Sequence, residues 1–173
     1  MRKVKLSVAT SLDNYIARPD GGYDWILHGQ EHGLAEFFST VDVALIGRKT
    51  HDLMVKAGSP CFPGMKNYVF SRTKTGRGEG GVEFVSADPK TFLEALRRKS
   101  GKDIWLAGGG ELALSFLQQR LVDELILAMQ PILLGDGLPL FAGEFPEAKL
   151  RLAQCQKYSN GVVHLTYEII HGE

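Results

Sequence analysis

The sequence is poor in cysteine and has no excess of charge of either sign. Cys61 and Cys155 are its two cysteines, and they are far apart rather than in a CxxC pair. Two such thiols cannot build a disulfide framework, and they fit the reducing cytoplasm, where we expect the protein to reside. Twenty basic residues balance twenty acidic ones, so the sequence lacks the positive field typical of proteins that bind nucleic acid or anionic membranes. Small molecules and protein partners are therefore favoured.

The sequence also lacks a long apolar run. The first residues carry positive charge, but the apolar stretch 3–10 is short, contains Lys5 and Ser7, and alternates as a strand does, unlike a secretion signal. No later segment is long enough to span a membrane. With 44% hydrophobic and 23% charged residues, the chain suffices for one well-buried core but not for two full domains. We expect a single domain over residues 1–173.

Strand-like and helix-like segments alternate along the chain. The predicted strands cover residues 3–10, 41–46, 67–70, 82–85, 103–107, 124–129, 150–158 and 162–170. The predicted helices cover residues 31–39, 50–56, 89–99 and 111–119, with Asp88 as the N-cap of the third. Asn160-Gly161 marks a hairpin between the last two strands, and the glycine-rich stretch 75–81 reads as a loop. This order predicts an α/β fold with a mixed, mostly parallel sheet and a C-terminal antiparallel hairpin.

Three consecutive glycines, Gly108, Gly109 and Gly110, stand between a predicted strand and a predicted helix. In parallel α/β sheets ligands bind at this kind of junction, because helix N-termini present unpaired N–H groups to anions. Glycine lets a phosphate approach the backbone, although the same glycines also suit a tight turn with no ligand. The spacing up to Ala113 satisfies the dinucleotide fingerprint, which alone is weak.

A standard NAD-binding unit also needs an acidic residue about 20 residues further on. The segment 127–131 has none, and Asp123 and Glu124 come too early. The loops after two other strands carry arginines, Arg48 and Arg72, and an arginine can hold a phosphate in two bonds. Three strand ends with glycine, hydroxyl and arginine therefore favour a phosphate-rich ligand such as NADP, although either arginine alone could be a solvated surface charge.

Four motifs occur here in the order and spacing of a known family: "SVATSLDNYIA", "VALIGRKT", "YVFSRT" and "IWLAGGGEL". With the later "VDELILAMQPILLGDGLPLF", they resemble the dihydrofolate reductase superfamily, in the branch similar to the reductase domain of riboflavin biosynthesis, the C-terminal part of a bifunctional deaminase-reductase. The resemblance covers nearly the whole chain. It implies a three-layer dihydrofolate-reductase-like α/β fold and NADPH as cofactor.

The resemblance also implies roles for individual residues. Those similar to the nicotinamide-lining positions are Ala9, Asn14 and Ile16. Those similar to the positions that meet the cofactor's phosphates are Gly47, Arg48, Lys49 and Thr50, and Thr50 is also expected to cap the helix that follows. Ser71 and Arg72 resemble the 2′-phosphate site. The diphosphate turn would comprise Gly108, Gly109, Gly110, Glu111 and Leu112. Asn14 replaces the glycine of many relatives and, like glycine, tolerates left-handed geometry.

The substrate side is less defined. Folate reductases place an acid about one helical turn after a tryptophan, and here Trp25 is followed at that distance by Gly29, Gln30 and then Glu31. We expect Asp24, Trp25 and Glu31 to lie near the substrate. Asp13, after the first strand, is the candidate catalytic proton donor or the residue that organises this loop, and a simple turn residue is an equal alternative. His28 and His32 lack an evident third ligand, so no metal site is expected.

The sequence thus predicts an NADPH-dependent reductase that transfers a hydride to a small heterocyclic or ribosylated substrate, similar to 5-amino-6-(5-phosphoribosylamino)uracil reductase of riboflavin biosynthesis. A dihydrofolate reductase and a non-catalytic NADPH-binding module are the alternatives. We further expect a homodimer, because related reductase domains pair and because residues 132–141 are apolar yet rich in glycine and proline. The interface would include that segment or the neighbouring sheet edge; the alternative is that the segment folds over its own sheet.

Overall fold

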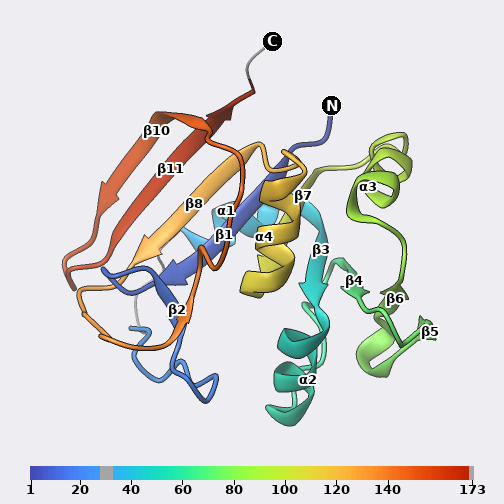
Figure 1. The fold of residues 1–173 in the computed structure, drawn as a ribbon, viewed down its shortest axis with the longest axis horizontal. Coiled ribbons are helices and arrows are strands. Elements are labelled where there is room, and N and C mark those ends of the chain that lie inside the picture. Colours follow the sequence, from blue (N-terminus) through green and yellow to red (C-terminus); the bar gives the residue numbers. More distant parts are fainter. Residues whose placement is uncertain (28–32, 172–173) are drawn as a thin grey trace.

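The computed structural model describes residues 1–27 and 33–171. Its main feature is a nine-stranded sheet, which forms the centre of the molecule in Figure 1. The strand order across it is β10-β11-β8-β1-β7-β3-β4-β6-β5. The strands of this sheet are β1 (Val4–Thr10), β3 (Val41–Gly47), β4 (Lys66–Phe70), β5 (Gly76–Arg77), β6 (Glu83–Val85), β7 (Asp103–Gly108), β8 (Glu124–Met129), β10 (Lys149–Lys157) and β11 (Val163–Ile170). Strands β2 (Tyr15–Ala17) and β9 (Leu138–Pro139) form a separate antiparallel pair.

The sheet is parallel in its centre and antiparallel at its two ends. The central strands run in one direction: β8, β1, β7, β3, β4 and β6. At one end of the sheet β11 and β10, and at the other end β5, are antiparallel to their neighbours. The mixed, mostly parallel sheet and the closing hairpin are therefore confirmed. The hairpin turns at Asn160-Gly161, where Gly161 has a φ of 92°, as the dipeptide predicts.

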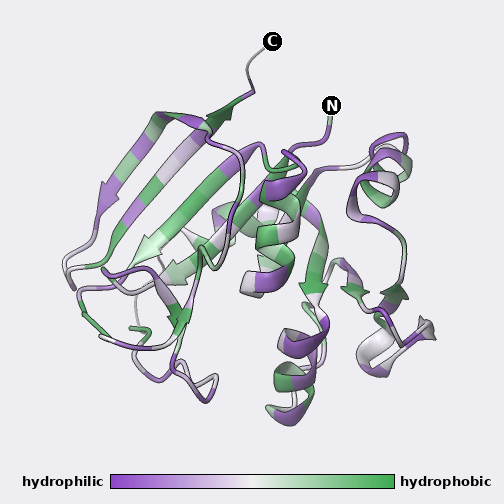
Figure 2. Ribbon diagram, in the orientation of Figure 1, coloured by the Kyte–Doolittle hydropathy of each residue, from purple (hydrophilic) through white to green (hydrophobic). Residues whose placement is uncertain are grey.

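Helices cover both faces of the sheet and complete three layers. The helices are α1 (Leu34–Thr40), α2 (Arg48–Lys56), α3 (Pro89–Arg97) and α4 (Gly110–Gln118). The larger core packs α3 and α4 on one face, with Phe116 fully buried. The smaller core lies under α2 on the other face, where Phe37 of α1 also packs edge-on and Phe38 tilted against Trp105. Strand β3 is nearly continuously apolar because both of its faces are covered (Figure 2).

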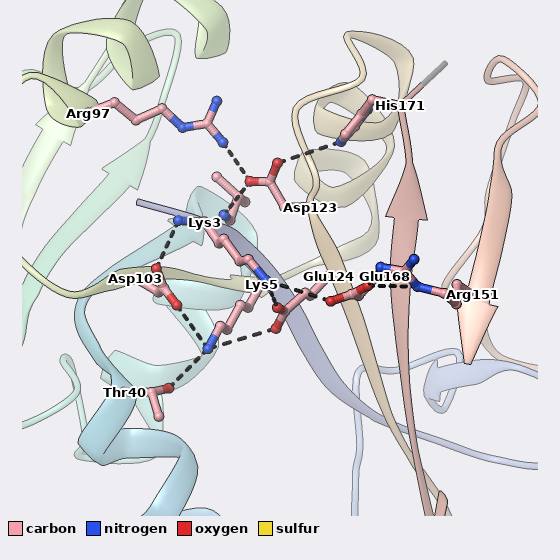
Figure 3. A network of polar contacts seen from close by, with 11 residues as sticks. Lys3, Lys5, Thr40, Arg97, Asp103, Asp123, Glu124, Arg151, Glu168 and His171 are labelled. Atoms are coloured by element: carbon pink, nitrogen blue, oxygen red, sulfur yellow. Dashed lines mark hydrogen bonds and ion pairs between the residues drawn. The ribbon is translucent and has the colours of Figure 1, made fainter. Parts of the chain in front are cut away.

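The amino ends of the central strands are joined by ion pairs (Figure 3). Nζ of Lys5, at the start of β1, lies 3.0 Å from a carboxylate oxygen of Asp103 and 3.8 Å from one of Glu124. Nζ of Lys3 lies 2.6 Å from the other carboxylate oxygen of Glu124. Asp123 pairs with Arg97 and accepts from the backbone N–H of Val4. The network therefore links strands that are distant in sequence. It lies at the opposite end of these strands from Gly108, Gly109 and Gly110, called here the glycine turn.

Several local predictions are confirmed and others are wrong. Asp88 caps α3 as expected, accepting from the N–H groups of Lys90 and Thr91. Thr50 is not an N-cap, because α2 begins two residues earlier at Arg48 with extended Gly47 in the capping position. The stretch 75–81 is not all loop: it contains β5 and a 3₁₀ turn over Glu79–Gly81. In the described part of the chain, no helix is long and apolar enough to span a bilayer.

Candidate functional site

The N-termini of α2 and α4 lie side by side at the edge of the sheet where β1, β3, β4 and β7 end, called here the carboxyl edge (Figure 1). A Cβ atom on Gly47 would lie 3.2 Å from the backbone N of Gly109 and 3.5 Å from the carbonyl O of Gly108, so the two backbones approach closely. Gly47 and Gly109 are the N-caps, and among the described residues neither helix has a side-chain cap. Two uncapped helix starts leave N–H groups directed at one place, a geometry suited to an anion.

The glycine turn is shaped by contacts within the chain itself. Gly108 has a φ of 106°, which favours glycine, and the Gly108–Gly109 peptide bond is cis. A Cβ on Gly109 would lie 2.8 Å from Oγ1 of Thr50, and one on Gly110 would lie 3.0 Å from the carbonyl O of Pro139. The close approach of Thr50 and Pro139 therefore accounts for the absence of side chains here. Access for a diphosphate stays a prediction in addition to this packing reason.

Four cations gather at the carboxyl edge, and two carboxylates partner three of them. Nη1 of Arg48 lies 2.6 Å from Asp52, Nζ of Lys74 lies 3.2 Å from the other oxygen of Asp52, and Lys49 pairs with Glu111. The hydrogen bond from Lys49 lowers the pKa of Glu111, and the charges of Lys49, Arg72 and Arg48 act in the same direction, which outweighs burial. The sequence predictions included Arg48, Lys49, Arg72 and Glu111 but missed Lys74 and Asp52.

Ser71 is buried and tied into the turn that carries Arg72. Its Oγ accepts from the backbone N–H groups of Thr73 and Lys74, and its own N–H donates to Val85 of β6. Among the described residues Oγ is seen only as an acceptor, and the turn that it stabilises presents Arg72 on the surface. The signal for this turn was present in the sequence, since serine at a strand end commonly bonds to the backbone that follows it.

The predicted nicotinamide positions lie at the end of β1, in the turn that follows it and on β2. Ala9 is half-buried and pairs with Ala128 of β8, and Asn14 has a φ of 62°, so its left-handed geometry is confirmed. Ile16 reaches the glycine turn, because its Cδ1 would lie 3.7 Å from a Cβ on Gly110. Leu112 differs from these residues: its side chain belongs to the core, so only its backbone could meet a ligand.

Asp13 binds the segment that follows β8. Its carboxylate accepts from the backbone N–H groups of Leu134 at 3.1 Å and Gly135 at 2.8 Å and from the hydroxyl of Ser11 at 2.6 Å. The Ser11 hydrogen bond is the main cause that lowers the pKa of Asp13 to about 2. An ionised acceptor with these partners organises the loop rather than donating a proton, so the geometry favours the second of the two roles expected for it.

The structure describes two of the three predicted substrate residues, Asp24 and Trp25. Asp24 is exposed, and both of its oxygens bond to Arg18, at 2.7 and 2.9 Å. Trp25 is buried, and its Nε1 has no hydrogen-bond partner among the described residues. Glu31 lies outside the described residues, as do His28 and His32. Within residues 1–27 and 33–171 no group of His, Cys, Asp and Glu is arranged to hold a metal.

Thr10 is a further candidate that the sequence predictions missed. It ends β1 beside Ala9, is fully buried, and its Oγ1 has no partner in the described part of the chain. Its carbonyl O accepts from the N–H of Gln130, whose side chain in turn accepts from Leu27. Buried polar atoms usually have partners, so the unpaired groups of Thr10 and Trp25 mark this region as one where a ligand could supply them.

Comparisons with known proteins agree with the sequence resemblance. The profile of the family described as the RibD C-terminal domain matches residues 2–164. Two uncharacterized Bacillus subtilis proteins are similar over nearly their whole length: YwjB is 36% identical over 93% of this chain and 95% of its own, and YyaP is 32% identical over 96% and 94%.

Two solved structures have the same fold. A putative riboflavin biosynthesis protein from Shewanella sp. PV-4 matches with a TM-score of 0.86 at 27% identity, covering 99% of this chain and 100% of its own. A diaminohydroxyphosphoribosylaminopyrimidine deaminase/5-amino-6-(5-phosphoribosylamino)uracil reductase from Thermotoga maritima matches with a TM-score of 0.73 at 17% identity, covering 98% of this chain and 57% of its own. At that identity the second likeness supports the fold alone.

Proposed function

Because the chain belongs to the RibD C-terminal domain family, a riboflavin-pathway reductase family, we propose that it is an NADPH-dependent oxidoreductase that reduces a small heterocyclic or ribosylated substrate. Bound NADPH would supply the hydride from its nicotinamide ring. The residues of this chain would bind the cofactor, orient the substrate and exclude water.

The observation that carries the proposal is the pairing of two uncapped helix N-termini with a cluster of cations. Gly47 and Gly109 approach each other at the carboxyl edge. The pKa of Glu111 there is lowered by three nearby cations, Lys49, Arg72 and Arg48. Helix N-termini and guanidinium groups are the standard protein partners of phosphate. A dinucleotide whose diphosphate lies near Gly109 and Gly110 would meet both, so the residues fit NADPH.

The end of β1 is the place expected for the nicotinamide and the substrate. Ala9 and Ile16 offer small and apolar surface there, and Ile16 lies next to the glycine turn. Asp13 holds the loop that follows β8 to the loop that follows β1, which fixes one wall of this region. The hydroxyl of Thr10 is a further polar group beside Ala9.

The experiment that tests the proposal is a titration of the protein with NADPH and NADH, followed by NADPH oxidation with a substrate panel. We expect tight NADPH binding and turnover with a ribosylated aminopyrimidine. Turnover with dihydrofolate alone would make the protein a dihydrofolate reductase instead. Tight binding without oxidation by pterins, pyrimidines or carbonyl compounds would indicate a binding module. Failure to bind either nucleotide would refute the proposal.

A further inference from the structure

We propose that Asp52 controls how strongly this protein prefers nucleotides with a 2′-phosphate. Its carboxylate forms ion pairs with Arg48 and Lys74, the two cations that would bind that phosphate. This inference rests on the proposed function and adds Lys74 and Asp52 to the cofactor site. It makes Asp52 a specificity-determining residue whose carboxylate competes with the ligand.

The two cations reach Asp52 from different parts of the chain. Arg48 is the first residue of α2 and bonds to one carboxylate oxygen, Oδ2, from one helical turn away, at 2.6 Å. Lys74 comes from the turn after β4 and bonds to the other oxygen, Oδ1, at 3.2 Å. Each carboxylate oxygen therefore accepts from one cation. Two oxygens of a phosphate can take the same two partners, since arginine and lysine both bind phosphate oxygens.

Lys74 is held at this place by contacts other than its ion pair. Its backbone N–H donates to Oγ of Ser71 at 2.9 Å, and its Nζ lies 5.5 Å from the centre of the Phe84 ring. Its side chain is 48% exposed and that of Arg48 is 40% exposed, so an incoming anion can reach both. The turn thus presents a positioned cation rather than a freely moving surface lysine.

The cluster is continuous with the proposed diphosphate turn. Arg48 follows Gly47, whose backbone approaches Gly109 closely, and its charge also acts on Glu111 at the start of α4. Ser71 and Arg72 belong to the same turn as Lys74. A ribose phosphate bound between Arg48 and Lys74 would therefore belong to the same ligand as a diphosphate at the glycine turn.

Charge counting gives the expected direction. Burial by itself would raise the pKa of Asp52, but the hydrogen bond from Lys74 and the charges of Lys74 and Arg48 lower it, so the carboxylate is ionised at neutral pH. Two positive charges and one negative charge leave the cluster with one positive charge. Removing the charge of Asp52 would raise the net charge of these three groups from one to two and free both cations to bind a phosphate.

The test measures nucleotide binding by calorimetry in Asp52→Asn, an isosteric neutral variant. The ligands are NADP⁺ and NAD⁺, together with 2′,5′-ADP and 5′-ADP as fragments that need no nicotinamide site. We expect Asp52→Asn to strengthen binding of NADP⁺ and 2′,5′-ADP by about threefold or more, a modest factor because the cations are partly exposed. Binding of NAD⁺ and 5′-ADP, which carry the diphosphate but no 2′-phosphate, should gain by a clearly smaller factor. The gain should shrink between about 50 mM and about 300 mM salt.

Two variants complete the design. Lys74→Met should weaken NADP⁺ binding and spare NAD⁺, whereas a lysine that serves only to neutralise Asp52 would change stability alone. Glu94→Gln removes one exposed negative charge from α3 and should change neither ligand's affinity, which controls for net charge.

The outcomes separate this inference from the proposed function. If the wild type binds neither NADP⁺ nor NAD⁺, both fall. If it binds NADP⁺ but Asp52→Asn leaves that affinity unchanged or weakens it, the proposed function stands and the role of Asp52 is refuted. Unchanged NADP⁺ binding in Lys74→Met would refute the role of Lys74 even if Asp52→Asn did not fold.

Discussion

A Cβ atom on Gly109 would lie 2.8 Å from Oγ1 of Thr50, so the glycine turn and the first turn of α2 constrain each other. Gly109 has a φ of −83°, which alanine adopts freely. We therefore expect Gly109→Ala to destabilise the protein by overpacking, by about 1–3 kcal/mol, in urea unfolding experiments. The double variant Gly109→Ala/Thr50→Ala should recover much of this loss because it removes the atom that clashes.

Thr50→Ala alone is the control that completes this double-mutant cycle. Unchanged stability in Gly109→Ala, combined with lost NADP⁺ binding, would contradict the packing explanation. It would mean that the turn lacks a side chain only to admit a ligand.

The sequence predicts the central fold well because local signals there agree with tertiary packing. The apolar run of β3 and the capping Asp88 of α3 each identify an element without reference to the rest of the chain. Strands β2 and β9 are different, since two or three residues carry no periodicity and their pairing depends on the path of distant loops.

The candidate site divides in the same way. Gly47, Arg48 and the three glycines follow strands directly, so their convergence at one edge could be predicted from parallel topology. The pairing of Lys74 with Asp52 joins a loop to a helix across 22 residues, and no spacing rule predicts it. The burial of Trp25 could not be predicted either, because the sequence pattern does not indicate which side of an irregular loop faces the interior.

Asp13 should stabilise the loop that it binds in a pH-dependent manner. Its pKa is lowered from 3.8 to about 2, so its stabilising effect is complete above pH 3.8 and is lost as the pH falls toward 2. We expect Asp13→Asn to speed hydrogen exchange at the amides of Leu134 and Gly135 at neutral pH. The difference from the wild type should vanish toward pH 2. A difference that did not depend on pH would contradict the role of the carboxylate charge.

His51 is a buried polar residue whose replacement should stabilise the protein. It is 3% exposed, packs edge-on against Phe84, and in the described part of the chain neither ring nitrogen has a hydrogen-bond partner. Burial lowers its pKa below the usual 6.5, so protonation favours the unfolded state and stability is lost as the pH falls below about 6.5.

We expect His51→Phe to raise the free energy of unfolding by about 1–2 kcal/mol at acidic pH, with a smaller gain at pH 8. Urea unfolding of both proteins across this range measures the difference. His51→Leu guards against overpacking by the larger ring. A gain in either variant that was equal at both pH values would show that His51 does not titrate in this range.

The predicted homodimer is best placed on the β10 edge. The end of the segment 132–141 packs on its own chain, since Leu140 is 1% exposed and Phe141 packs against the larger core, whereas Leu133 and Leu138 are 68% and 43% exposed. Strand β10, by contrast, is exposed along all nine residues, with Leu150 44% and Leu152 51% exposed. Leu150 is opposite Ile169 and Leu152 opposite Tyr167 of β11, and both of these partners pack against the larger core, so the leucines extend an apolar sheet face to an open edge.

A second copy related by a two-fold axis would cover this apolar face and the long open edge at once, both of which soluble proteins tend to protect. We therefore expect light scattering at micromolar concentration to give twice the chain mass of 19.1 kDa. Leu152→Lys should return the protein to a monomer without unfolding it. Gln154→Lys places the same charge on the same strand but on the other face, because a register shift between Leu152 and Gln154 sets Gln154 opposite Thr166. This variant should stay dimeric. A mass near 19.1 kDa that persisted as concentration rose would refute the dimer, and equal effects of the two lysines would refute its placement on the leucine face.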